Sequence, residues 1–281
     1  MASSELLMEI GLRGTKSTVT KSYFTSPLKI GLPKTEGDRL KVVLMMASAG
    51  VLKGDAFSYR IHCQPHTKTL ITEQSYTKLF DTGDAGAAKT QIITVDEGAS
   101  LYYCPQAVIP FAGSRFDSAV MIDIKENSEL LFTDIVTAGR VGMGERFAFH
   151  HYHSRVCVRI DGKPAWIDNC LLEPECMDMR SMLFFDQYTH IGTMYCHHPC
   201  AGIAGMEADI KAGIEAGIKA GIEEKVLQMN NKAYGSMRIG ASRAVRGVCL
   251  RVLAHSAQDI EELFGHAAHF LTEYSASAEI S

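Results

Sequence analysis

Short runs of alternating apolar and polar residues fill the chain between residues 40 and 190. The runs are rich in Val, Ile, Tyr, Phe and Thr and are separated by turn residues, a pattern typical of β-strands that bury one face. No long helical periodicity interrupts them. The predicted strands are Lys41–Met46, Ser58–Cys63, Thr67–Glu73, Thr90–Val95, Ser100–Cys104, Ala119–Ile124, Glu129–Ile135, Phe147–Tyr152 and Arg155–Ile160.

A weak internal repeat connects several of these strands. Each unit consists of a strand, a polar turn, a second strand and a longer connection that contains glycine. Three copies align at Cys63, Val95 and Ile124, and a looser fourth copy starts at Cys157 and turns at Asp161–Gly162. The spacing between these three positions is typical of stacked supersecondary units. It predicts a mainly β, extended solenoid-like or layered architecture. A β-sandwich whose hairpins resemble one another fits the pattern equally well.

The C-terminal third has a different composition. Residues 212–223 repeat a four-residue unit three times, so that isoleucines recur at a spacing of four residues. Ion pairs at this spacing contribute about 0.2–0.5 kcal/mol each, whereas each interior glycine costs a helix about 1 kcal/mol. A marginal helix that is ordered only when packed is therefore expected, and no chemistry is assigned to it.

A second helix is expected after Ser256. Ser256 and Asp259 form an S-x-x-D capping signal, and an apolar face follows it. This face either docks on its own domain or is offered to a partner protein. The whole chain is predicted to be one domain, residues 1–281, that is β-rich at 20–200 with helical additions at 203–231 and 257–273.

Composition and charge argue against a nucleic-acid-binding, secreted or membrane-spanning protein. The net charge is −4 and charged residues make up 21% of the chain, which gives no basic face for nucleic acid. The N-terminus lacks the pattern of a secretory signal, and no apolar run is long enough for a membrane-spanning helix. With no export signal, the eight cysteines are expected to be reduced thiols, mostly packed as small hydrophobic side chains in a cytoplasmic protein.

The sequence contains no nucleotide-binding loop, no nucleophile elbow and no H-E-x-x-H zinc motif. Its densest group of metal-ligand types is Cys196, His197, His198 and Cys200. Thiolate and imidazole suit zinc, nickel or copper, so a metal-dependent hydrolase built on this cluster is an alternative function. Buried thiols at a strand end are the simpler interpretation.

Other polar groups stand out less. His151 and His153 would share one face of a strand while His150 points to the other face, but two ligands do not make a metal site. An exposed polar strand is the simpler interpretation. Asp55 follows Gly54 in a turn, and Asp134 interrupts an apolar run. A carboxylate in such a run must be hydrogen-bonded, paired or facing a wet cavity.

Several of these segments resemble the family of urease accessory proteins called UreD or UreH. The segment SYFTSPLKI is similar to the N-terminal strand of the family. Ser48–Asp55 is similar to its S-x-G-G-x-x-x-G-D signature, with Val51 in place of a glycine. Thr69–Phe80 resembles its T-x-Q-S/A-x-x-K segment. The segments PQAVIPFAGSRF, AGRVGMGERF and DNCLLEP resemble further family blocks. The resemblance runs from about Tyr23 to Tyr274.

The resemblance implies a protein that is not an enzyme, with a mostly β fold and a few helices. Such a protein is a scaffold for nickel insertion into the urease apoprotein, binding UreF directly and the GTPase UreG through UreF. It implies no tightly bound cofactor and only a nickel ion in transit, through an internal passage. The candidates for that passage are Asp55, Thr72, Ser75 and Asp134. The other positions that match family motifs are Gly54, Gln74, Lys78, Gly139, Arg140 and Glu145.

Three functions are therefore compared: a nickel-delivery scaffold, a metal-dependent hydrolase at Cys196–Cys200, and a structural β-solenoid without metal. Sparse oxygen ligands in a shielded channel suit a protein that must release nickel, because thiolates and imidazoles bind this ion tightly.

Overall fold

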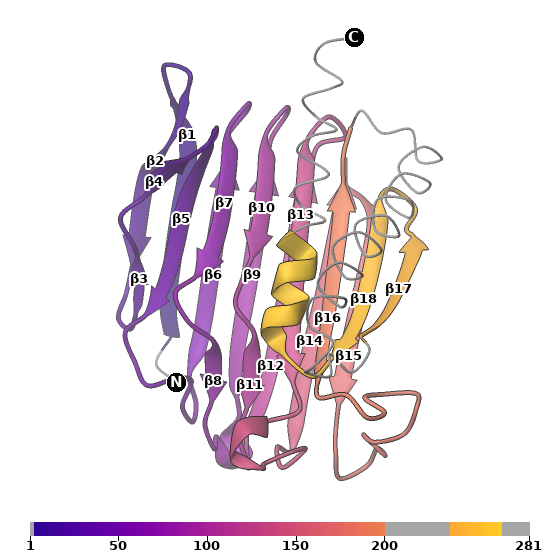
Figure 1. Ribbon diagram of the computed structural model, residues 1–281. Helices are drawn as coiled ribbons and strands as arrows, with labels where there is room; N and C mark the ends of the chain where they lie inside the picture. The colour runs from indigo at the N-terminus through magenta and orange to yellow at the C-terminus, as the bar shows by residue number, and fades with distance from the viewer. Residues whose placement is uncertain (1–2, 200–236, 266–281) are drawn as a thin grey trace, which may run out of the picture.

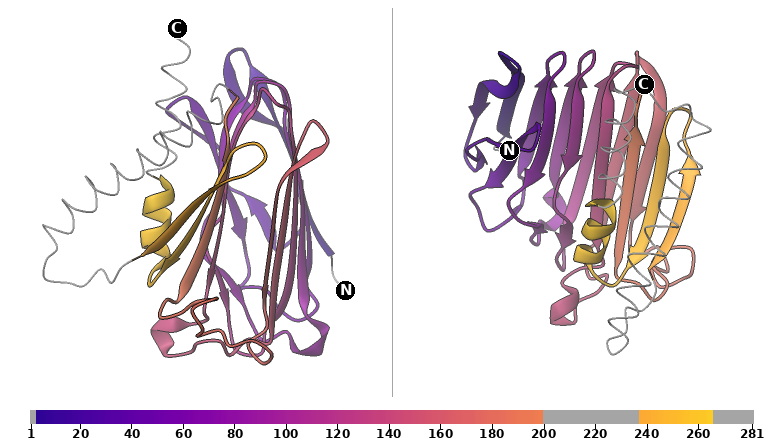
Figure 2. Two further views of the ribbon diagram at one scale, coloured as in Figure 1. Left: turned by 90° about the vertical axis from the view of Figure 1, so that its right-hand side faces the viewer. Right: turned by 45° about the horizontal axis from the view of Figure 1, so that its top comes forward.

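Two long β-sheets lie face to face in the computed structural model, which describes residues 3–199 and 237–265. Figure 1 shows the strands side by side along the molecule, and the edge-on view of Figure 2 shows the two layers with their interior between them. Inward-facing positions alternate with outward-facing ones along each strand, as the period of two in the sequence predicts. The prediction of a mainly β, solenoid-like layered fold is confirmed.

The first sheet, called sheet A, has seven strands. Its central strands β1, β6, β9, β12 and β14 run parallel to one another, and antiparallel strands close both edges. In spatial order the strands are β15 (Lys163–Leu172), β14 (His151–Ile160), β12 (Arg115–Ile124), β9 (Ala87–Val95), β6 (Ala56–Cys63), β1 (Ser3–Arg13) and β2 (Lys16–Phe24).

The second sheet, called sheet B, combines a parallel half and an antiparallel half. Strands β5, β7, β10 and β13 are parallel, whereas β16, β18 and β17 add in antiparallel fashion. In spatial order the strands are β17 (Arg238–Arg243), β18 (Val248–Ala254), β16 (His190–His197), β13 (Glu129–Thr137), β10 (Ser100–Cys104), β7 (Lys68–Glu73), β5 (Arg39–Met46) and β3 (Leu28–Ile30). The short strands β4 (Lys34–Glu36), β8 (Thr77–Leu79) and β11 (Val108–Pro110) pair beside this path.

The internal repeat corresponds to successive coils of the chain. In each of the first three copies the first strand lies in sheet A, the polar turn crosses to the other layer, and the second strand lies in sheet B. Backbone hydrogen bonds join equivalent turns of successive coils. The Ser100 N–H donates to the Thr67 carbonyl at 2.7 Å, and the Glu129 N–H donates to the Ala99 carbonyl at 2.9 Å. Stacking of this kind lets each coil cover the apolar face of the next one.

The fourth copy of the repeat breaks this rule. The chain reverses at Asp161 and Gly162, with φ values of 47° and 76°, and β15 returns antiparallel to β14 within sheet A. Two consecutive residues at positive φ make the tight turn of a hairpin, which is too short to cross between layers. The solenoid therefore ends here.

Several strands were absent from the prediction. β1 and the first residues of β2 precede the expected β-rich region 20–200, and β17 and β18 lie between the two expected helical segments, 203–231 and 257–273. The expected strands Phe147–Tyr152 and Arg155–Ile160 are also wrong as separate elements, because one strand, β14, starts at His151. Phe147 has a φ of 57° and belongs to the preceding loop.

Residues 257–265 are helical, within the expected segment 257–273, and this helix packs on the outer face of sheet B (Figure 2). Ser256 Oγ accepts the Gln258 N–H at 3.1 Å at its start. Ile260, Leu263 and Phe264 join an apolar cluster with β13, β16 and β18, so the helix docks on its own domain. The expected helix at 203–231 lies outside the described residues. No helix in the described part is long and apolar enough to span a membrane.

Candidate functional site

A group of polar and charged side chains crosses the largely apolar interior between the two sheets. Strand register places them at neighbouring levels: Lys89 is paired with Ser118 and Ser118 with Ser154 in sheet A. In sheet B, Asp134 is paired with Thr193 and Thr193 with Arg251. We call this group the interior polar belt; its members are Glu73, Lys89, Ser118, Asp134, Ser154, Asp168, Thr193 and Arg251.

An ion pair between Lys89 of β9 and Glu73 of β7 forms one part of the belt and bridges the sheets. Lys89 Nζ lies 2.9 Å from Glu73 Oε1, and each side chain is only 12% exposed. Lys89 Nζ also lies 4.7 Å from the centre of the Tyr59 ring. Burial lowers the pKa of Lys89, but the Glu73 carboxylate and nearby phenols raise it by more than burial lowers it. The pKa of Lys89 therefore lies above its usual range. The lysine therefore stays charged.

Asp134 forms the middle of the belt. Its Oδ2 accepts a hydrogen bond of 2.8 Å from Ser154 Oγ, which again bridges the two sheets. Burial raises the pKa of Asp134; the carboxylates of Asp168 and Glu73 also raise it, while Ser154 and Lys89 lower it. Asp134 thus contributes a carboxylate that has a hydroxyl partner and lacks a cationic partner in direct contact among the described residues.

Asp168 and Arg251 form the other end of the belt. They join β15 of sheet A to β18 of sheet B through an ion pair of Asp168 Oδ1 with the Arg251 guanidinium. The Asp168 side chain is 6% exposed and that of Arg251 is 55% exposed, so the belt reaches solvent on this side. The belt as a whole holds three carboxylates and two cationic side chains. The excess carboxylate suits a passing cation.

A pocket of about 210 Å³ adjoins the Glu73 end of the belt. Its lining includes Gln74, Ser75 and Lys78, so the structure brings together three of the positions singled out in the sequence. Glu73 and Tyr59 also line it. Glu73 therefore belongs both to the pocket and to the interior polar belt.

Two of the predicted passage residues lie elsewhere. Asp55 Oδ2 accepts the Leu52 N–H at 2.8 Å and closes the turn before β6, where Gly54 has a φ of 77°. Thr72 lies next to Glu73 on β7, so its side chain points to the opposite face of sheet B. The structure thus separates Asp55 and Thr72 from Asp134.

The family-motif positions Gly139, Arg140 and Glu145 form the loop that follows β13 and contains the short helix η2 (Val141–Met143). Gly139 has a φ of 123°, and a Cβ there would lie 3.0 Å from the Glu145 carbonyl oxygen. Glu145 accepts hydrogen bonds from Arg140 at 2.5 Å and from the Ala112 N–H at 2.9 Å. The Arg140 partner lowers the pKa of Glu145 despite partial burial. These contacts give the loop its shape.

The cysteine and histidine cluster is divided by its strand. On β16, Cys196 packs in the apolar cluster under the helix, and its thiol donates to the Val248 carbonyl. His197 points to the other face, where its ring contacts the Glu126 carbonyl oxygen at 3.1 Å. Burial raises the pKa of Cys196 to about 12, which disfavours the thiolate that metals require. His198 is buried at the strand end, and Cys200 lies outside the described residues.

Glu73 and Lys89 were not among the site residues predicted from the sequence. A signal was present, because both stand at inward positions of strands that also bury apolar residues, for example Ile71 before Glu73 and Ile93 after Lys89, although Thr69 and Gln91 are polar inward residues of the same strands. The ion pair between Glu73 and Lys89 could not be predicted from the sequence, because it depends on how the two sheets face each other.

Three known proteins that are similar to this chain carry the same description, urease accessory protein UreD or UreH. The family model described as UreD urease accessory protein matches residues 2–280. The urease accessory protein UreH of Helicobacter pylori (strain HPAG1) is 34% identical over 205 residues, covering 72% of this chain and 77% of the relative. UreD of Acetivibrio thermocellus is 32% identical over 193 residues, covering 68% and 74%. UreD of Actinobacillus pleuropneumoniae serotype 5b is 29% identical over 280 residues, covering 97% and 98%.

Proposed function

Since the chain belongs to the UreD urease accessory protein family, we propose that it passes nickel to the urease apoprotein through the interior polar belt. In this proposal the chain acts as a scaffold without turnover of its own. It binds UreF, and through UreF it meets the GTPase UreG, which carries the nickel ion.

The observation that carries the proposal is the placement of oxygen ligands between the sheets. The Glu73, Asp134 and Asp168 carboxylates follow one another across an apolar interior, with the Ser154 hydroxyl beside Asp134. Oxygen ligands hold a borderline ion such as Ni²⁺ less tightly than thiolates or clustered imidazoles do. Such a belt supports transfer, because an ion that is bound weakly at several points moves on.

The scaffold part of the proposal is tested by partner binding. The full chain, co-expressed with UreF, is expected to co-migrate with it in size-exclusion chromatography. Migration of the two proteins as separate species would contradict the assignment of UreF as the direct partner.

The maturation part is tested in cells. A strain that lacks this chain is expected to assemble urease without nickel, and the wild-type gene is expected to restore urease activity. Full urease activity in the deleted strain would contradict the scaffold function and would favour a structural solenoid. The hydrolase alternative receives no support from the described geometry, because Cys196 and His197 lie on opposite faces of β16.

A further inference from the structure

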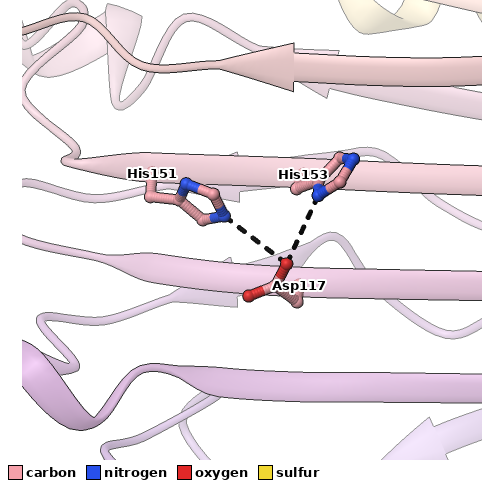
Figure 3. A group of neighbouring side chains, drawn as sticks. All are labelled: Asp117, His151 and His153. Carbon is pink, nitrogen blue, oxygen red and sulfur yellow. Dashed lines mark hydrogen bonds and ion pairs between the residues drawn. The ribbon is translucent and has the colours of Figure 1, made fainter.

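A second group of metal-ligand side chains lies on the outer face of sheet A, on the opposite side of that sheet from the interior polar belt. His151 and His153 project from β14, and Asp117 projects from the neighbouring strand β12 (Figure 3). Strand register pairs Asp117 directly with His153. The ligand atoms of the three residues all lie within 4.8 Å of one another, and they form the one group of three or more such residues in the described part of the chain.

Both imidazoles aim one nitrogen at the same carboxylate oxygen. His151 Nε2 and His153 Nδ1 each lie 3.5 Å from Asp117 Oδ1. A tetrahedral ion with bonds of about 2.0–2.1 Å holds its ligand atoms about 3.4 Å apart. The two nitrogen–oxygen separations match that spacing and are longer than the roughly 2.7–2.9 Å of a charge-assisted hydrogen bond, while the two nitrogens lie within 4.8 Å of each other.

The opposite nitrogen of each ring is held by an oxygen acceptor. His151 Nδ1 lies 3.0 Å from Glu173 Oε1, and His153 Nε2 lies 2.7 Å from Asn169 Oδ1. In the tautomers that carry the proton on these outer nitrogens, both outer contacts are hydrogen bonds and the lone pairs of His151 Nε2 and His153 Nδ1 face Asp117, which is the arrangement that a bound metal ion requires. Metal-binding histidines are oriented by such contacts in the same way.

We propose that Asp117, His151 and His153 bind one divalent transition-metal ion of the nickel and zinc class on the outer face of sheet A. Two imidazoles and one carboxylate suit these ions, whereas Mg²⁺ and Ca²⁺ prefer oxygen alone. The two rings are about one-fifth exposed and the Asp117 side chain is 57% exposed, so water completes the coordination and the ion exchanges with solvent. The site does not depend on the proposed nickel passage.

The test is metal binding to the purified full-length chain, measured by isothermal titration calorimetry with NiCl₂ and with ZnCl₂, and by metal analysis after dialysis. The double variant His151→Ala/His153→Ala is expected to bind one ion fewer than the wild-type chain. Asn169→Ala, which removes only the acceptor for His153, is expected to keep the site and weaken it by about 10–100-fold.

The matched control is His62→Ala. His62 also forms an outward-facing histidine–carboxylate pair on sheet A, with Asp96 at 2.7 Å, and it belongs to no three-residue group in the described part. This variant is expected to bind as the wild-type chain does. If the double variant is folded by circular dichroism and still binds the same number of ions with unchanged affinity, the proposal is overturned.

A spectroscopic measurement needs no variant. X-ray absorption of the chain loaded with one equivalent of Ni²⁺ is expected to show two imidazole ligands, and a first shell without imidazole would overturn the proposal. Failure of this site leaves the nickel passage intact, because variants of the belt are scored by urease maturation and variants of this site by ion binding to the isolated chain.

Discussion

The Lys89–Glu73 pair has consequences for stability because both side chains are nearly inaccessible to solvent. Two charges taken out of water gain little net stability as a pair, but removal of one partner leaves the other uncompensated. The carboxylate of Glu73 would then lie beside the phenol of Tyr59, with only the hydrogen bond from Thr77 at 3.3 Å left to it.

Lys89→Met is therefore expected to lower the free energy of unfolding by about 3 kcal/mol, because it strands the buried Glu73 carboxylate. Urea denaturation followed by circular dichroism measures the change. The double variant Lys89→Met/Glu73→Gln is expected to recover most of the loss. A single variant as stable as the wild-type chain would show that Glu73 is solvated in the folded protein.

His190 predicts how stability changes with pH. Burial, together with the nearby His255 and Arg146, lowers the pKa of His190 to about 4, although a backbone hydrogen bond with Ala254 raises it. The unfolded chain binds a proton at about pH 6.5, so the unfolded state takes up more protons than the folded state between pH 6.5 and 4. The stabilisation is present above pH 6.5 and is lost as the pH falls through this window.

The expected loss for this residue is about 3 kcal/mol between pH 6.5 and 4. His190→Gln is expected to flatten that part of the profile, which urea denaturation at a series of pH values measures in both proteins. Parallel profiles for wild-type and variant chains would contradict the assignment.

At the scale of elements, the alternation and the repeat were sufficient to predict the coils. Equivalent turns after Cys63, Val95 and Ile124 carry the chain from sheet A to sheet B, as their shared pattern indicates. The limit of the repeat was not predicted. Asp161–Gly162 is a two-residue hairpin, and its difference from the four-residue turns decides whether the chain crosses layers.

The strand β18 was missed; its sequence VCLRVLA is an apolar run with one charged residue and does not show the alternation of the other strands. The neighbouring repeat at 212–223 and the helix after Ser256 dominated the interpretation of this third of the chain. Its pairing with β16 is a contact between segments far apart in the sequence, which local patterns do not specify.

Gly192 on β16 determines how closely the C-terminal helix docks. A Cβ at this position would lie 2.4 Å from Ile260 Cγ2 and 3.1 Å from Phe264 Cζ. Gly192→Ala is expected to push the helix away from sheet B and to destabilise the protein by about 1–3 kcal/mol. Hydrogen exchange of residues 257–265 is expected to accelerate.

The matched control is Gly240→Ala on β17, where a Cβ would meet nothing within 4 Å. This variant is expected to leave the exchange of the helix unchanged. Equal exchange in Gly192→Ala and in the wild-type chain would contradict the close packing of the helix.

At the scale of the whole molecule, only part of the candidate site could be predicted from the sequence. Asp134 was recognisable as a carboxylate in an apolar run, and Ser75, Gln74 and Lys78 line one pocket with Glu73. The closeness of Glu73, Asp134 and Asp168 in the interior depends on the strand register within both sheets and on how the two sheets are packed against each other. The same holds for the outer metal-ligand group, where Asp117 comes from a neighbouring strand.

Asp134→Asn separates the function of the belt from its stability. Because burial raises the pKa of Asp134, the ionised carboxylate costs stability at neutral pH, and the amide still accepts the Ser154 hydroxyl. The variant is expected to be at least as stable as the wild-type chain at pH 7. The difference is expected to shrink as the pH falls toward 3.8, which denaturation at both pH values measures.

The most direct test of nickel passage is the nickel content of urease that is assembled with this variant. Urease is purified from a strain in which Asp134→Asn replaces the wild-type chain, and the nickel bound per active site is measured by mass spectrometry. The control is Thr133→Val, one residue earlier on β13 and facing away from the interior. We expect a severalfold lower nickel content with Asp134→Asn and a normal content with Thr133→Val. Normal nickel content with Asp134→Asn would contradict the passage of nickel along the interior polar belt.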